Sequence, residues 1–261
     1  MDTDAITTLL QQVAAEVITP RFRSLDADEV HEKNPGDLVT VADHEAEELI
    51  TRALEAAYPE AVVLGEEATA ADPTLLERFA AAEHAFTVDP VDGTKNFVNG
   101  SPDHAVMAAE LRAGVVVRSW IWQPQHELAY TAELGAGAWR NGSRLELEPA
   151  SGEPRGRTSR RSWVGRSPTG APPLELTWAS CGIDLPHLVE GDVDYLLYRA
   201  TKPWDHAPGA LLVTEAGGAV ATLPGTPYDP RHSSRDGLVA ARDPATYDVA
   251  RTGWERSLSG R

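Results

Sequence analysis

Apolar residues recur every three or four positions in two stretches near the start of the chain, and this spacing predicts two amphipathic helices. The first is expected to end near Pro20, and its apolar positions are Ile6, Leu9, Leu10, Val13 and Val17. The second is expected over residues 43–58 and is stopped by Pro59. We interpret Glu45, Glu47 and Glu48 as the solvent-exposed face of this second helix.

Short apolar runs bounded by turn residues predict strands further along the chain. Buried strands are expected at 61–64 and 85–88, followed by an antiparallel meander over 104–111, 115–122 and 128–134. Later strands are expected at 174–178, 193–198, 219–223 and 238–241, with helices at 181–190 and 205–216 between them. This mixture of helices and strands indicates an α/β chain.

Residues 149–173 are rich in Pro, Gly, Ser and Arg, and we interpret them as a mobile connector with a short strand at 162–164. The arginines that make this stretch basic are Arg155, Arg157, Arg160, Arg161 and Arg166. The alternative is a lid, formed by 155–166, that reaches toward an anionic substrate. The connector is favoured because runs of charge are usually solvated.

The charge balance excludes two classes of partner. The 261-residue chain has 23 basic and 40 acidic residues, which gives a formal net charge of −17. Such a surface repels nucleic acid and anionic membranes, so we expect neither as a partner. It would also repel an anionic substrate unless bound divalent cations offset the charge locally.

Cysteine usage and the lack of long apolar runs predict a soluble, cytoplasmic protein. Cys181 is the only cysteine, so no intrachain disulfide can form. The acidic N-terminus lacks the basic and apolar regions of a signal peptide. No run approaches the ~18 apolar residues that a membrane span needs.

One stretch, Asp89-Pro-Val-Asp-Gly-Thr-Lys-Asn-Phe97, combines the features of a metal site and a phosphate site. Asp89 and Asp92 supply hard oxygen ligands for a cation such as Mg²⁺. Gly93 lets the backbone turn sharply, and the N–H groups of Gly93 and Thr94 can bind an anion where a helix begins. The plain alternative is a capped turn between a strand and a helix.

Three further acidic residues lie at the boundaries of predicted elements. Asp37 follows a turn at 34–36, Glu66 follows the strand at 61–64, and Asp205 begins a helix. Open α/β sheets place their sites just past strand ends, as at Glu66. Each residue also has a purely structural explanation, a polar turn for Glu66 and a helix N-cap for Asp205.

The order of these motifs resembles the inositol monophosphatase family. The resemblance is carried by Gly65-Glu66-Glu67, the 89–97 stretch, Trp204-Asp205 and Glu215-Ala-Gly-Gly218. It implies a layered α-β-α-β-α fold of the α/β (α+β) class with two subdomains, residues 1–148 and 149–261. It also implies a Mg²⁺-dependent, typically lithium-sensitive phosphatase that forms a homodimer.

The resemblance assigns metal ligands for two to three Mg²⁺ ions, with Mn²⁺ as a possible substitute. Glu66, Asp89 and the backbone carbonyl of Val91 would hold one ion. Asp89, Asp92 and Asp205 would hold a second. Two metals of this kind can stabilise the attacking and leaving oxygens when a phosphate monoester is hydrolysed.

The resemblance also assigns catalytic roles. Asp37 would lie near a third, weaker metal and hydrogen-bond Thr94, and Thr94 would help to orient the attacking water. Glu66 would ligate the metal that lowers the pKa of this water, with Asp92 at the second metal. The N–H groups of Gly93 and Thr94 would bind the phosphate.

The expected substrate contacts are Ser180, Cys181, Tyr198, Asp92 and Asp205, and some of them depart from the inositol-specific members. Tyr198 stands where those members have an acidic residue, and 179–182 replaces the segment that lines their inositol pocket. These departures bear on specificity for myo-inositol 1-phosphate and leave the metal site intact. We therefore expect a small polyol, sugar or amino-alcohol phosphate, with histidinol phosphate and an intermediate of specialised metabolism as alternatives.

Two competing interpretations remain. A haloacid-dehalogenase-type phosphatase also carries an Asp-Gly-Thr string, but it spaces its aspartates as Asp-x-Asp and would leave Glu66 and Asp205 unexplained. A regulatory or interaction protein could keep the phosphatase fold without its activity, because a fold alone does not define a function. The complete set of expected metal ligands favours the enzyme.

Overall fold

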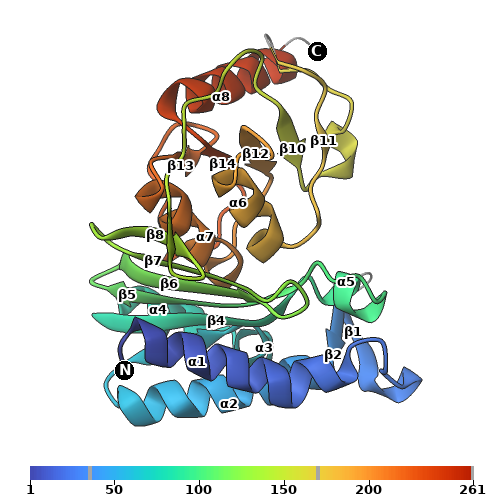
Figure 1. The fold of residues 1–261 in the computed structure, drawn as a ribbon, viewed down its shortest axis with the longest axis vertical. Helices are drawn as coiled ribbons and strands as arrows, with labels where there is room; N and C mark the ends of the chain where they lie inside the picture. Colours follow the sequence, from blue (N-terminus) through green and yellow to red (C-terminus); the bar gives the residue numbers. More distant parts are fainter. Residues whose placement is uncertain (35–36, 169–170, 260–261) are drawn as a thin grey trace.

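The chain forms alternating layers of helix and sheet (Figure 1). Helices α1 (Thr3–Val13) and α2 (Val41–Ala57) lie on one face of a seven-stranded sheet, and α6 (Cys181–Val189) and α7 (Pro203–Glu215) lie on the other. A five-stranded sheet follows, and α8 (Pro244–Ser259) covers its far side. The predicted layered α-β-α-β-α fold is confirmed.

The computed structural model describes residues 1–34, 37–168 and 171–259, and the side chains of Ala27, Asn34, Asp37 and residues 255–259 lie outside the described part. No helix among the described residues is long and apolar enough to cross a membrane. The shorter helices are α3 (Glu66–Ala71), α4 (Leu75–Ala81), α5 (Thr94–Val98), the π-helix η1 (Ala14–Ile18) and the 3₁₀ turns η2 (Thr19–Arg21), η3 (Ala27–Glu29) and η4 (Arg161–Trp163).

The seven-stranded sheet has the order β3-β4-β5-β6-β7-β8-β9 and is antiparallel except for its β3–β4 pair. Its strands are β3 (Val62–Gly65), β4 (His84–Asp92), β5 (Ala105–Arg112), β6 (Val115–Gln123), β7 (Leu128–Glu133), β8 (Gly137–Arg140) and β9 (Ser143–Leu145). The predicted meander is confirmed. Because β3 and β4 are parallel, joined by a crossover through α3 and α4, their C-terminal ends lie side by side.

The five-stranded sheet has the order β11-β10-β12-β14-β13. Its strands are β10 (Gly156–Thr158), β11 (Glu175–Leu176), β12 (Tyr195–Tyr198), β13 (Ala219–Thr222) and β14 (Leu238–Ala241). Strands β11, β10 and β12 are parallel to one another, and β14 pairs antiparallel with β12 and β13. Three C-terminal strand ends therefore lie at one edge of this sheet. A separate hairpin joins β1 (Val30–Asn34) to β2 (Asp37–Thr40).

Both sheets are buried on two faces, so their central strands carry apolar residues at consecutive positions. On β4, Phe86 and Val88 belong to the core under α1 and α2, whereas Ala85 points into the core shared with α6 and α7. On β12, Leu196 belongs to that second core and Leu197 to the core under α8. Successive side chains of a strand alternate between faces, which distributes the apolar runs over the separate cores.

The predicted mobile connector at 149–173 contains an ordered strand, so that interpretation is corrected. Strand β10 lies inside the five-stranded sheet, with β11 on one side and β12 on the other. A strand was expected at 162–164, but Ser162 and Trp163 belong to the 3₁₀ turn η4, and Trp163 is buried. A strand of three residues is too short for its alternation to be visible in sequence. The subdomain boundary near residue 149 stays a prediction.

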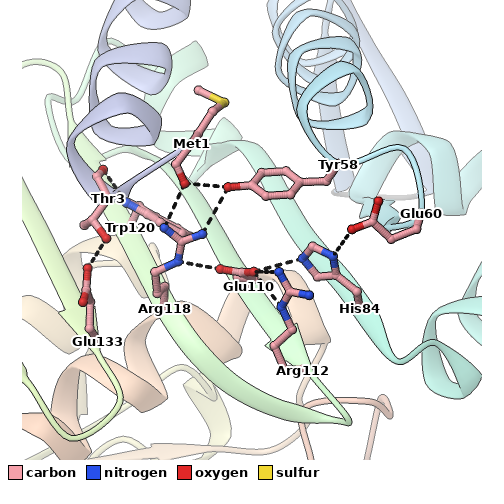
Figure 2. A network of polar contacts seen from close by, with 10 residues as sticks. All are labelled: Met1, Thr3, Tyr58, Glu60, His84, Glu110, Arg112, Arg118, Trp120 and Glu133. Atoms are coloured by element: carbon pink, nitrogen blue, oxygen red, sulfur yellow. Dashed lines mark hydrogen bonds and ion pairs between the residues drawn. The ribbon is translucent and has the colours of Figure 1, made fainter.

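A polar network holds the start of α1 against the sheet (Figure 2). Its centre is Glu110 on β5, whose side chain is 2% exposed. Arg118 Nε donates to Glu110 Oε2 over 2.5 Å, and the same guanidinium donates to the carbonyl oxygen of Met1 and to the Tyr58 hydroxyl. His84 Nε2 lies 2.9 Å from Glu110 Oε1. The buried carboxylate is thus paired, and its partners link β5 to the first residue of the chain and to the end of α2.

We expect Glu110→Gln to lower the free energy of unfolding by about 3 kcal/mol, because it leaves the Arg118 guanidinium without its buried counter-charge. Urea denaturation measures this loss. The matched control is Glu60→Gln, since Glu60 contacts His84 in the same network but is 66% exposed, and its change should stay within about 0.5 kcal/mol. Equal small effects of the two substitutions would contradict a stabilising role for the network.

Candidate metal and phosphate site

Three carboxylates from three separate elements converge at one point. Oxygen atoms of Glu66, Asp89 and Asp205 all lie within 4.8 Å of one another. Glu66 begins α3 and Asp89 lies on β4, and the pairing of Gly65 with Val88 sets these two residues next to each other at the end of a parallel strand pair. Asp205 comes from the first turn of α7, which packs against β4.

An irregularity in β4 shapes the rest of the motif. Asp89 pairs with Met107 and Asp92 with Ala105. Between these two pairs, β4 has two residues where β5 has one. Side chains three positions apart in a regular strand point to opposite faces, and one extra residue restores them to the same face. Gly93 follows with φ 85°, and a Cβ there would lie 2.9 Å from the Ser180 Cβ. The chain can therefore turn sharply into α5 only with glycine at this position.

Asp92 is held by the start of α6 and does not belong to the three-carboxylate cluster. Its Oδ2 accepts a hydrogen bond of 2.7 Å from the Gly182 amide and a short one from the Ser180 hydroxyl. Burial raises the pKa of Asp92 to about 6 against these hydrogen bonds, which favour its charged form. Asp92 thus lies between the cluster and the segment that was predicted to contact the substrate.

The cluster concentrates negative charge where water has little access, since Asp89 is buried and Glu66 and Asp205 are only partly exposed. Burial, reinforced by Glu66, Asp92 and Asp205, raises the pKa of Asp89 well above its usual range. Burial also raises the pKa of Asp205 to about 8. Asp89 is 2% exposed, and its Oδ1 has no hydrogen-bond partner among the described residues. A buried carboxylate oxygen without a partner is costly, so this arrangement calls for a cation.

The nearest cations of the chain lie to one side of the cluster. Lys33 Nζ is 2.9 Å from Glu66 Oε1 and 2.9 Å from Glu67 Oε1, and Lys202 Nζ is 3.6 Å from Glu66 Oε1. Burial lowers the pKa of Lys33, but the contacts with Glu66 and Glu67 outweigh this effect and raise the pKa above its ordinary value. Neither lysine satisfies Asp89 Oδ1. Carboxylate oxygens in this number are the ligands that Mg²⁺ prefers, so the residues fit a divalent cation.

The Thr94 hydroxyl has two partners among the described residues. Its hydroxyl lies 3.0 Å from the Val91 carbonyl oxygen and 3.1 Å from Asp43 Oδ1. Asp37, the expected partner, has a side chain outside the described residues, and the contact found is made by Asp43. Burial raises the pKa of Asp43 to about 7, against hydrogen bonds from Thr40 and Thr94. The sequence signal for Asp43 is a capping box, Thr40-x-x-Asp43, at the start of α2.

Glu47 was expected on the wet face of α2, and this prediction is wrong. Its side chain is buried and accepts hydrogen bonds from the Glu67 amide at 2.8 Å and the Ala68 amide at 2.7 Å. A Cβ on Gly65 would lie 2.2 Å from the Glu47 carboxyl carbon, so glycine is needed there to admit the carboxylate. Glu47 therefore holds the backbone that directly follows Glu66 and packs against Gly65, which precedes it. Burial raises its pKa to about 7.

A cavity of about 330 Å³ lies beside Asp92 and Asp205. Small-molecule sites typically have volumes of ~300–1,000 Å³, so a metabolite fits. The cavity lies at the C-terminal ends of β10, β11 and β12, the position where open α/β sheets bind ligands. Its other lining residues are Ser159, Arg161, Leu176, Thr177, Ala179, Ser180, Cys181, Asp184, Tyr198, Ala200 and His206. The structure thus brings the predicted Ser180, Cys181 and Tyr198 to one wall.

Two side chains of this wall are tied to others behind it. The Tyr198 hydroxyl donates to Asp184 Oδ2 over 3.2 Å, and the Tyr198 ring meets the His206 ring edge-on at 4.8 Å between centroids. Burial lowers the pKa of His206 to about 4, so this imidazole is neutral near pH 7. His206 is 3% exposed and therefore belongs to the protein interior behind the cavity. Cys181 Sγ lies 3.9 Å from His206 Nε2.

A second acidic group, His187, Glu190 and Asp192, also brings ligand atoms within 4.8 Å of one another. Glu190 Oε1 already accepts hydrogen bonds from the Tyr130 hydroxyl and from Arg140. Asp192 is exposed and pairs with His187. These carboxylates already have hydrogen-bond partners within the chain, unlike Asp89 Oδ1.

Comparison with known proteins agrees with the fold and shows the family. The model of the inositol monophosphatase family matches residues 2–256, so the chain belongs to this family. An inositol-1-monophosphatase of Rhizobium meliloti is 34% identical over 206 residues, which are 71% of this chain and 72% of that protein. The Nus factor SuhB of Pseudomonas aeruginosa is 30% identical over 237 residues, 82% of each chain. An IMPase structure from Thermotoga maritima has a TM-score of 0.81 at 23% identity and covers 98% of each chain, which supports the fold.

We expect Glu47→Gln to weaken Mg²⁺ binding by about 10-fold, because the new amide group sets an N–H against a backbone N–H beside Glu66 and loosens that ligand. Calorimetric titration with Mg²⁺ measures the affinity. Glu48→Gln is the matched control, since Glu48 is 60% exposed and pairs with Arg52 on the same helix. Unchanged affinity in a folded Glu47→Gln protein would contradict a positioning role for Glu47.

Proposed function

We propose that the chain is a Mg²⁺-dependent phosphomonoesterase that acts on a small polyol, sugar or amino-alcohol phosphate. The observation that supports this most directly is the convergence of Glu66, Asp89 and Asp205, with an unpartnered buried oxygen, beside a cavity of metabolite size. Membership of the inositol monophosphatase family supports the same class of reaction. Histidinol phosphate and specialised metabolites stay alternative substrates.

In this proposal Glu66, Asp89 and the carbonyl of Val91 hold one Mg²⁺, and Asp89, Asp92 and Asp205 hold another. A third, weaker ion near Asp37 stays a prediction, as does substitution by Mn²⁺. When bound, the ions would supply positive charge to the phosphoryl oxygens and to a nearby water. The carboxylates must be deprotonated to bind them, and a cation would offset the repulsion that raises their pKa values.

The remaining steps belong to the residues of the chain. The N–H groups of Gly93 and Thr94 would donate to the phosphate at the start of α5. The Thr94 hydroxyl directs its proton toward Val91 and Asp43, which leaves its lone pairs to accept a hydrogen bond from the attacking water. Asp43, held by Thr40, fixes this orientation. No nucleophilic side chain is required.

A second candidate function is a regulatory or interaction role. It is favoured by the similarity to proteins named Nus factor SuhB, which share about the same level of identity as the enzymes. The two roles can coexist on one fold. Cytoplasmic location, lithium sensitivity and homodimerisation stay predictions from the family resemblance.

Release of inorganic phosphate from a panel of phosphomonoesters, with Mg²⁺, with EDTA and with Mg²⁺ plus Li⁺, tests the proposal. We expect release that needs Mg²⁺, and a loss of at least about 100-fold in Asp205→Asn, because the charge stabilisation by a metal is worth several kcal/mol. Asp192→Asn is the matched control, since it removes a carboxylate from the second acidic group and should leave the rate unchanged. Activity that survives EDTA would contradict the mechanism.

A further inference from the structure

Among the described residues, the lining of the cavity includes one arginine and no lysine, and the arginine comes from the arginine-rich segment. Arg161 lines the same cavity as Asp92 and Asp205. His206, also in the lining, is buried with its ring edge-on against the Tyr198 ring. The cavity therefore has carboxylates next to the metal site and a permanent cation, the guanidinium of Arg161, elsewhere on its wall.

Two neighbouring arginines, Arg157 and Arg160, have side-chain partners, whereas the exposed side chain of Arg161 has none among the described residues. Arg157 Nη2 lies 2.9 Å from Glu175 Oε2, and Arg160 Nε donates to Ser162 Oγ over 2.7 Å. Within the described residues, the guanidinium of Arg161 takes part in no hydrogen bond or ion pair. An arginine held at a cavity wall without a counter-charge is available to an anionic ligand.

The backbone that carries Arg161 is fixed, in contrast to the mobile connector expected from composition. Arg161 begins the turn η4 three residues after β10, and the Val164 amide donates to its carbonyl oxygen. Trp163 in the same turn is 6% exposed, and its ring centroid lies 4.2 Å from that of Trp254. This anchor places the side chain at the cavity without the cost of ordering a loop.

The other charges of the lining are accounted for. Asp92 and Asp205 belong to the proposed metal site. Asp184 is buried, and its two oxygens accept from the Trp178 amide at 2.8 Å and the Tyr198 hydroxyl at 3.2 Å. Among the described residues, Arg161 is thus the one ionisable side chain of the lining with neither a place in the proposed metal site nor a hydrogen-bond partner within the chain, apart from Cys181 and His206, which contact each other.

We propose that Arg161 determines specificity by binding a second anionic group, a carboxylate or a second phosphate, on the substrate. This inference rests on the proposed function, because the ester phosphate must lie at Glu66, Asp89 and Asp205. The planar guanidinium donates two parallel N–H bonds to a carboxylate or phosphate, which a neutral hydroxyl cannot match. The preferred substrates are therefore phosphomonoesters with an acidic group at their other end.

Affinities of matched phosphonates for the Mg²⁺-loaded protein test this inference. The first pair is the phosphonate isosteres of 3-phosphoglycerate and glycerol 3-phosphate, which differ by a carboxylate against a hydroxymethyl group. The second pair is propane bisphosphonate and hydroxypropylphosphonate, which differ by a second phosphonate group against a hydroxyl group. Phosphonates resist hydrolysis, so calorimetry reports their binding whether or not the chain hydrolyses esters.

In at least one pair, we expect the wild-type chain to bind the compound with two acidic groups at least 10-fold more tightly than the compound with one. Arg161→Gln should reduce this ratio of affinities to near one. The pair that shows the preference identifies the acidic group. Arg160→Gln removes the same charge one residue away from the lining and should leave the ratio unchanged.

The inference would be overturned by a wild-type ratio near one for both pairs, or by a ratio that survives Arg161→Gln. An equal loss of the ratio in Arg160→Gln would also overturn it, because it would indicate a diffuse electrostatic effect. A failed phosphate-release assay together with an Arg161-dependent ratio would instead overturn the proposed function and leave the anion site in place.

Discussion

The structure depends on gathering like charges at a partly buried point where water screens them poorly. Glu66, Asp89 and Asp205 come from β3–α3, β4 and α7, and they meet within 4.8 Å. Folding must bring them together against their repulsion, which is why burial and neighbouring carboxylates raise the pKa of Asp89 so far. A divalent cation turns this unfavourable contact into a favourable one, so the energy of the site is coupled to the energy of the fold.

The surrounding fold limits how these carboxylates can move. The extra residue in β4 sets Asp89 and Asp92 on one side, and the amide of Gly182 holds Asp92. Glu47 accepts from the two amides that follow Glu66, so the ligand is positioned from behind by a second buried carboxylate. The C-terminal ends of β10, β11 and β12 then supply the cavity next to the metal. One sheet thus positions the cation site, and the other forms the wall that the substrate would meet.

Much of this arrangement could be predicted from local signals. The alternation of apolar runs and turns gives the layers, and the 89–97 stretch and the order of the motifs give Glu66 and Asp205. Glu47 was missed because its charge was taken as a sign of solvent, although it lies three residues before the buried Ile50. Asp43 was missed because a capping box explains it locally. The availability of Arg161 depends on which neighbouring arginines find partners, and that follows only from the packing of β10 and η4.

The most direct test of this account is the melting temperature of the wild-type chain and of Asp89→Asn as a function of Mg²⁺ concentration. The account predicts that Mg²⁺ raises the melting temperature of the wild type progressively. Without metal, Asp89→Asn should be more stable than the wild type, because it removes a buried carboxylate from among like charges, and Mg²⁺ should change it little. A wild-type melting temperature that does not respond to Mg²⁺, together with a destabilised Asp89→Asn, would contradict the claim that these carboxylates are assembled to hold a cation.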